Sequence, residues 1–206
     1  MWAVFVTVER PSAKALNRAL LLIQDFEFSE YPIDSQWTLV TSKDLPSTVP
    51  AATTLPLLPD ITTNNAFALM SLAEINLFVR TNEVALEDIN ISSGDWLVID
   101  QIGLETSTCL VCRQVYDSAG KEDGKTGGLT SEFRACRVPY EKAWGMISNA
   151  DVVDLEGFVD EDATPEPEDW IWSLSSELRP ETEGMTEVET KREKALKELR
   201  DGGHAD

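Results

Sequence analysis

The sequence has almost no histidine. Its single histidine, His204, follows a Gly-Gly pair at the far end of the 206 residues, where we expect it to be solvated and mobile. One such residue cannot supply the Ser-His-Asp or Cys-His arrangements of nucleophilic enzymes. It also cannot build a histidine-based zinc or non-haem iron site. The sequence therefore excludes these classes of chemistry.

Cysteine is scarce, and its spacing does not favour reactivity. Cys109 and Cys112 have CxxC spacing, but they fall in an expected strand, where residues i and i+3 point to opposite faces. A redox CxxC pair needs a helix N-terminus to stabilise its thiolate, and Cys136 alone does not complete a Cys₄ zinc set. We expect three reduced, buried thiols in an intracellular compartment, the cytoplasm first, with the nucleus left open.

Glycine-rich phosphate motifs are missing too. The sequence has no GxGxxG and no P-loop, and Gly124, Gly127 and Gly128 lie in an expected hairpin connection rather than between a strand and a helix. We therefore expect no cofactor and no metal.

Basic side chains are few, with 17 Lys and Arg against 37 Asp and Glu and a net charge of −20. Residues 1–160 hold 23 acidic and 11 basic side chains, and residues 161–206 hold 14 and 6. This balance argues against nucleic acid and against an anionic membrane surface. It permits a basic protein partner, a cation, or simply good solubility.

Long apolar runs are absent, so no membrane-spanning helix is expected. The first ten residues are apolar but lack a basic region, and their alternation predicts a strand over Trp2–Val8 rather than a signal peptide.

The strongest positive signal is the apolar run Gly94–Ile102, which predicts a strand buried on both faces at the centre of the domain. The pattern predicts further strands at Leu20–Gln24, Trp37–Thr41, Ile75–Arg80, Thr108–Tyr116 and Glu132–Val138, and helices at Ala66–Ala73, Tyr140–Ile147 and Met185–Arg200. The expected fold is one α/β (or α+β) domain over residues 1–160. Its single mixed sheet has a parallel centre, an antiparallel edge and short flanking helices.

An acidic, proline-bearing linker at Glu161–Asp169 predicts a domain boundary there, and residues 161–206 form a tail that ends in the amphipathic helix. Trp170 and Trp172 lie in an apolar island of this tail. They either fold back onto the domain or anchor a partner. The tail helix has three alternatives: its own domain, a second copy, or a partner groove.

One constellation of charged residues could form a site. Asp25, Arg80 and Asp100 each follow or end an expected strand, and parallel strands would bring these ends to one sheet edge, where ligands of open α/β sheets bind. Such a cluster could hold a cation or a polar ligand, although ion pairs that merely close the strand ends would look the same. Arg134 and Arg137 have odd spacing on their strand, so at most one of them can join, and Arg134 is the candidate ligand-binding residue of the two.

The order of segments resembles a family of small uncharacterised α/β domains of unknown function, found in actinobacteria and fungi. The resemblance covers about residues 20–160 and rests on short segments: Leu20–Phe26, Asn76–Arg80, Trp96–Asp100, Phe133-Arg134 with Val138-Pro139, and Asn149–Asp151 with Phe158. It implies one α/β domain and marks Asp25, Asp100 and Arg134 as shared positions. The connection at residues 117–130 is longer than the family's hairpin, and the tail has no counterpart there. The family brings no function.

Two hypotheses of different classes follow. The first is a non-catalytic protein-interaction domain whose partner is basic or engages the tail. The second is a small enzyme or a small-ligand or cation-binding domain that uses Asp25, Arg80 and Asp100, and it requires these side chains to share a cleft.

Overall fold

The computed structural model describes residues 1–28, 30, 35–57, 64–116, 129–148, 171–173 and 185–206, and every structural statement below concerns these residues. The expected connection at residues 117–130, the linker Glu161–Asp169 and Trp170 lie wholly or mostly outside them.

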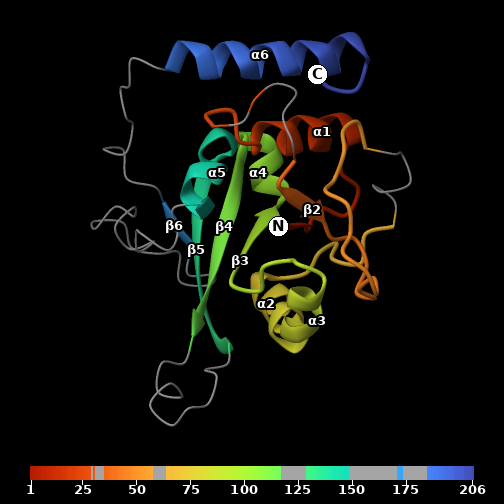
Figure 1. Ribbon diagram of the computed structural model, residues 1–206, viewed down its shortest axis with the longest axis vertical. Coiled ribbons are helices and arrows are strands. Elements are labelled where there is room, and N and C mark those ends of the chain that lie inside the picture. Colours follow the sequence, from red (N-terminus) through yellow and green to blue (C-terminus); the bar gives the residue numbers. More distant parts are fainter. Residues whose placement is uncertain (29, 31–34, 58–63, 117–128, 149–170, 174–184) are drawn as a thin grey trace.

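A single mixed sheet organises the molecule (Figure 1). Its strand order is β2-β1-β3-β4-β5-β6, with β1 at Trp2–Val6, β2 at Trp37–Leu39, β3 at Asp95–Ile99, β4 at Thr108–Tyr116, β5 at Leu129–Pro139 and β6 at Ile171–Ser173. β1 pairs in parallel with β2 and β3, whereas β4 runs antiparallel to β3 and β5, and β6 is parallel to β5. The predicted α/β class is confirmed, and β3 lies in the interior of the sheet as the run Gly94–Ile102 predicted.

The helices are α1 at Ala13–Leu22, α2 at Leu72–Thr81, α3 at Glu83–Asp88, α4 at Gln101–Thr106, α5 at Tyr140–Ser148 and α6 at Met185–Asp201. The helices predicted at Tyr140–Ile147 and Met185–Arg200 are therefore confirmed. The central run is shorter as a strand than predicted, because Asp100 ends β3 and begins α4. The close packing of α4 on β4 requires Gly103, since a Cβ there would lie 2.3 Å from the Thr108 carbonyl oxygen.

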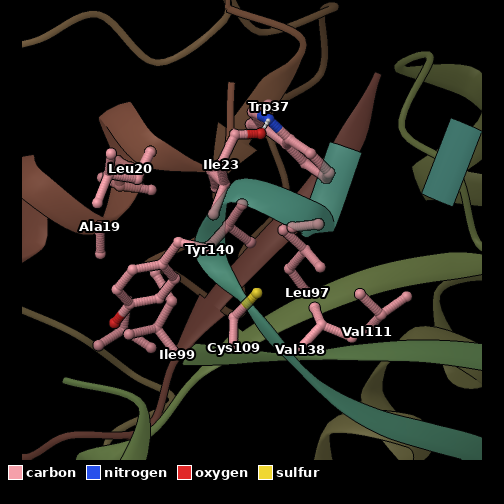
Figure 2. Close-up of a cluster of buried hydrophobic side chains, with 14 of the residues drawn as sticks. Ala19, Leu20, Ile23, Trp37, Leu97, Ile99, Cys109, Val111, Val138 and Tyr140 are labelled. Carbon is pink, nitrogen blue, oxygen red and sulfur yellow. Dashed lines mark hydrogen bonds between the residues drawn. The ribbon is translucent and has the colours of Figure 1, made fainter. Parts of the chain in front are cut away.

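One face of the sheet packs against α1 and α5 (Figure 2). Val4, Leu97 and Val111 point to this face from three adjacent strands, and Leu20 of α1 and Tyr140 of α5 cover them. Two polar groups within the layer find backbone partners: Trp37 Nε1 donates to the Ile23 carbonyl at 3.0 Å, and the Tyr140 hydroxyl donates to the Gly103 carbonyl at 2.8 Å. Burial here therefore leaves these polar groups paired.

The opposite face packs against α2 and α3. Phe5 contacts Phe67 and Phe78 through edge-to-face rings with centroids 4.8 and 6.0 Å apart. Ile75 and Leu86 bring the inner sides of α2 and α3 onto the same cluster. The sheet is thus covered on both faces, which explains why β3 is apolar at every position after Asp95.

α6 lies on α1 as an additional layer (Figure 1). Ala195 of α6 packs with Leu21 and Phe26, and Val188, Leu196 and Leu199 border this contact. Beyond the helix, Asn17 Nδ2 donates to the His204 carbonyl at 2.9 Å, so the main chain at His204 is held although its side chain is exposed. Of the three alternatives for the tail helix, the structure shows docking on its own domain.

Two predicted strands and one predicted helix are wrong. Leu20–Gln24 is the last turn of α1 and the residues after it, and its unbroken apolar run reflects a helix buried between the sheet and α6. Ile75–Arg80 lies in α2, whose start is stabilised by a capping box between Ser71 and Glu74. The segment predicted as the helix Ala66–Ala73 is mostly a turn, and α2 begins only at Leu72.

Candidate functional site

The carboxyl ends of β1 and β3 form the place where an open α/β sheet would bind a ligand. The chain passes from β1 through α1 to β2, which lies on one side of β1 in the sheet. It then passes from β2 through α2 and α3 to β3, which lies on the other side of β1. The strand order therefore reverses between β1 and β3. Two main-chain hydrogen bonds close this edge, from Thr7 to Ile99 at 3.0 Å and from Leu69 to Thr7 at 2.8 Å.

Asp100 lies at this edge and has two structural tasks. Its Oδ1 accepts a hydrogen bond from the Gly103 amide at 2.6 Å, which caps α4. Both carboxylate oxygens also bind Arg137 of β5, at 3.0 Å from Nη1 to Oδ1 and 2.5 Å from Nη2 to Oδ2. The two side chains are only 22% and 18% exposed. This bidentate pair ties the end of β3 to β5 across β4.

The neighbours of this pair are also engaged. Arg137 Nη1 reaches the Thr108 hydroxyl at 3.3 Å, and Arg18 of α1 donates to the Ser107 hydroxyl at 2.8 Å. Ser107 itself has a φ of 58° at the end of α4. The arrangement can hold α1, α4 and the strand ends together, and the charges of Asp100 and Arg137 neutralise each other within the fold.

Asp25 lies at the other edge of the sheet. α1 starts beyond the carboxyl end of β1 and runs back, so that Ile23 bonds the Trp37 side chain at the start of β2. Asp25 is buried and accepts hydrogen bonds from the Glu27 and Phe28 amides at 3.0 and 2.9 Å. Its carboxylate therefore shapes the turn after α1.

Arg80 is in the last turn of α2, on the sheet face opposite α1. α2 runs away from the carboxyl edge, at which Leu69 lies just before the helix. Within α2, Asn76 Nδ2 donates a hydrogen bond to the Ser131 carbonyl oxygen near the start of β5. Arg80 thus lies toward the amino edge. The structure does not bring Asp25, Arg80 and Asp100 together, because two of the expected strands that carried them are helices.

Arg134 and Arg137 behave as their spacing predicts, since only one of them joins Asp100. Arg134 lies opposite Arg113 in the β4–β5 pairing and is 4.0 Å from Glu132. Arg113 binds Asp95 at 2.9 Å. Asp100 pairs with Arg137 and not with the candidate Arg134, and this choice depends on the register of β4 against β5, which the sequence does not reveal. The spacing Asp100-x-x-Gly103 was the available signal for the helix cap.

Trp172 belongs to β6, where its backbone is opposite Cys136 of β5. The position of its side chain and all of Trp170 lie outside the described part of the chain. Both roles, an internal contact and a partner anchor, therefore stay predictions for the two tryptophans.

The three cysteines are buried and free. Cys109 and Cys136 face the α1 side and Cys112 faces the α2 side, as predicted for i and i+3 on a strand. Burial raises the pKa of Cys136 to about 11, and burial also raises the pKa values of Cys109 and Cys112. Such thiols stay protonated and unreactive at neutral pH.

Within the described residues, no group of three or more His, Cys, Asp or Glu side chains is placed to hold a metal ion. The same residues contain no helix of the length and apolarity needed to cross a bilayer.

Exposed acidic side chains outnumber exposed basic ones in the described part of the chain. Among the described residues up to Ser148, nine acidic side chains are exposed: Glu9, Glu27, Glu30, Asp44, Glu74, Glu87, Asp88, Glu105 and Glu132. Three basic side chains are exposed: Arg10, Lys14 and Lys43. Most arginines of this part are half-buried, as Arg113 and Arg137 are, so acidic groups dominate the charge that meets solvent.

Comparison of the chain with protein-family models, with curated proteins and with solved structures gave no significant match. The resemblance to the small uncharacterised α/β family therefore stays a prediction.

Proposed function

We propose that this chain is a non-catalytic protein-interaction domain whose partner presents a basic surface. The observation that carries the proposal is the sign of the exposed charge, with nine acidic side chains against three basic ones up to Ser148. An acidic surface attracts a basic partner and speeds its approach.

The roles of the reactive residue types support a non-catalytic function. Asp100 and Arg137 neutralise each other, Asp25 shapes a turn, and the cysteines are sealed in the core. The enzyme hypothesis needed Asp25, Arg80 and Asp100 in one cleft. Their positions at opposite sheet edges and faces leave it without that geometric basis.

The internal contacts of the tail favour a partner site on the body. β6 extends the sheet beside β5, and α6 covers α1. The proposal extends to the setting of the protein: three free thiols fit an intracellular, cytoplasmic location, and the acidic surface does not fit nucleic acid.

The proposal is tested by measuring which proteins the immobilised full chain captures from solution. We expect specific proteins to bind at about 50 mM salt and to be released near 500 mM, since the Debye length falls from roughly 14 to 4 Å. A variant with Glu9→Gln, Asp44→Asn and Glu105→Gln should capture less. The matched variant with Arg10→Gln and Lys43→Gln should capture as much or more. Capture that ignores both salt and the acidic substitutions would refute a basic partner.

A further inference from the structure

The outer side of α2 and α3 carries apolar side chains that nothing in the described structure covers. Ala73, Leu77, Thr81 and Val84 follow one another at spacings of four, four and three residues, and all are exposed. We call them the α2–α3 outer stripe. Leu77 is 55% and Val84 71% exposed. Within α2, residues spaced by four share one side of the helix, and Val84 follows in the first turn of α3.

The backbone continues almost directly from one helix to the next. Asn82 is both the C-cap of α2 and the N-cap of α3. Its side-chain Nδ2 donates a hydrogen bond to the Phe78 carbonyl oxygen at 2.8 Å. The inner sides of both helices are independently occupied, with Ile75, Val79 and Leu86 in the core. Leu77 and Val84 are therefore not needed to hold α2 and α3 on the sheet.

Acidic groups border the stripe. Glu74, Glu83, Glu87 and Asp88 are the acidic residues of the two helices, and Arg80 is their one basic residue. Arg80 is half-buried with a buried Nε, so the two helices together carry four acidic side chains and one basic side chain. Hydrogen bonds from the Ser71 amide and hydroxyl lower the pKa of Glu74, and the nearby Lys43 ammonium lowers it further.

The molecule holds an occupied counterpart on its other face. The outer side of α1 contains Leu21, and α6, an amphipathic helix, buries it to 8% exposure. The basic side chain Lys14 of α1 pairs there with Asp206 at 3.0 Å. The α2–α3 outer stripe is also apolar, but the charged residues of its two helices are mostly acidic rather than basic.

From this apolar stripe and its acidic border we infer that α2 and α3 form the docking surface for a basic amphipathic segment, most simply a helix with Lys or Arg beside its apolar side. The inference rests on the proposed function and names the surface. Leu77 and Val84 provide the apolar contact, and the acidic border selects a basic partner over an acidic one.

A designed peptide tests the surface. The probe is an amphipathic helix of about 14 residues of leucine and lysine, and its counterpart has glutamate at each lysine position. Titration of the isotope-labelled full chain should shift the amide resonances of residues 73–88 with the lysine peptide and not with the glutamate peptide. Substituting Leu77→Ser with Val84→Ser should weaken binding at least about tenfold, since two apolar contacts are lost. The control, Val49→Ser with Ile102→Ser, removes exposed apolar side chains elsewhere and should leave affinity unchanged.

Charge is tested separately with Glu83→Gln and Asp88→Asn, which avoid the capping Glu74 and the Glu87–Ser93 hydrogen bond. We expect about threefold weaker binding at low salt and little effect at high salt. The docking surface would be overturned if the lysine peptide shifted only resonances of other residues, or shifted none at concentrations up to about 1 mM. The proposed function is decided separately, by the salt-dependent capture described above. Concentration-dependent dimerisation abolished by Leu77→Ser and Val84→Ser would also overturn the inference, because the stripe would then bind a second copy.

Discussion

α1 and α2 cover opposite faces of the same sheet, yet among the described residues a further helix covers α1 alone. Both helices have ten residues and both bury an inner apolar side. α6 lies over the outer side of α1, where Asn17 and Leu21 are buried, whereas Leu77 on the outer side of α2 meets solvent. The difference shows that an amphipathic pattern identifies the buried side of a helix only when one side is apolar. When both sides are, tertiary contacts decide.

The sharpest test of this comparison truncates the matching leucines. Leu21→Ala should lower the free energy of unfolding by about 2–3 kcal/mol, because the side chain is buried between α1 and α6. Leu77→Ala should change it by less than about 0.5 kcal/mol. Urea denaturation of the two variants measures both values. Equal losses would mean that the outer sides of α1 and α2 are buried alike.

The Asp100–Arg137 pair at the carboxyl edge provides a second test, because it joins β3 to β5 within the sheet that α1 and α2 cover. Asp100→Ala removes the α4 cap and leaves Arg137 unpaired, so we expect a loss of about 2–3 kcal/mol. Asp100→Ser keeps a capping oxygen and should lose about 1 kcal/mol less. Thermal unfolding of both variants is the measurement, and a loss that is the same for both would place the whole effect in the ion pair.

Alkaline pH tests how well the core under α1, where Cys136 lies, is sealed from solvent. Burial raises the pKa of Cys136 from its ordinary 9.0 to about 11, so the thiol's contribution to stability is fully present below pH 9 and is lost as pH rises through about 11. Each such group adds a slope of up to about 1.4 kcal/mol per pH unit in that window. Denaturation between pH 8 and 11 should show a shallower slope for Cys136→Ala and an unchanged one for Val49→Ala.

Thiol titration completes that test. Native protein at pH 8 should show no thiol that reacts with Ellman's reagent, and denatured protein should show all three. Fast reaction of Cys112 in Cys109→Ala, Cys136→Ala protein would mean that the α2 side opens more readily than the α1 side.

The smallest expected effect concerns the backbone just before α2. Leu69 has a φ of 61° and is 74% exposed, a conformation that costs a leucine about 1–2 kcal/mol. Leu69→Gly should therefore raise the free energy of unfolding by about 1 kcal/mol. The same change at Leu77, inside α2, should lower it by about 1 kcal/mol. Equal signs for the two glycine variants would contradict the left-handed geometry.

The strands were more predictable than the helices, for a reason visible in particular residues. Thr108–Tyr116 and Trp2–Val6 have the β-branched, apolar composition of strands and are strands. Ile75–Arg80 has a similar composition, but its apolar residues at 75, 78 and 79 lie on one helical side, and the capping box Ser71-x-x-Glu74 marks the start of a helix. The error at Leu20–Gln24 came from α6, which buries the second side of α1 through the contact of Ala195 with Leu21, 174 residues apart in the chain (195 − 21).

The candidate site failed for the same reason. Two of its three strand ends are helix ends, so their charged residues fall on other edges of the sheet. Asp100 remained at the predicted edge, but its partner is Arg137, and that choice depends on the register of β4 against β5, in which Thr108 pairs with Pro139.

The amino-acid sequence by itself determined the α/β class, the interior strand β3, the amphipathic tail helix and the acidic balance. These properties depend on composition and local periodicity. The tertiary structure decided which apolar sides are buried twice, which charges are neutralised and which stay at the surface. Such outcomes depend on contacts between residues far apart in the chain, as between α1 and α6 or between Asp100 and Arg137, and local sequence does not encode their geometry.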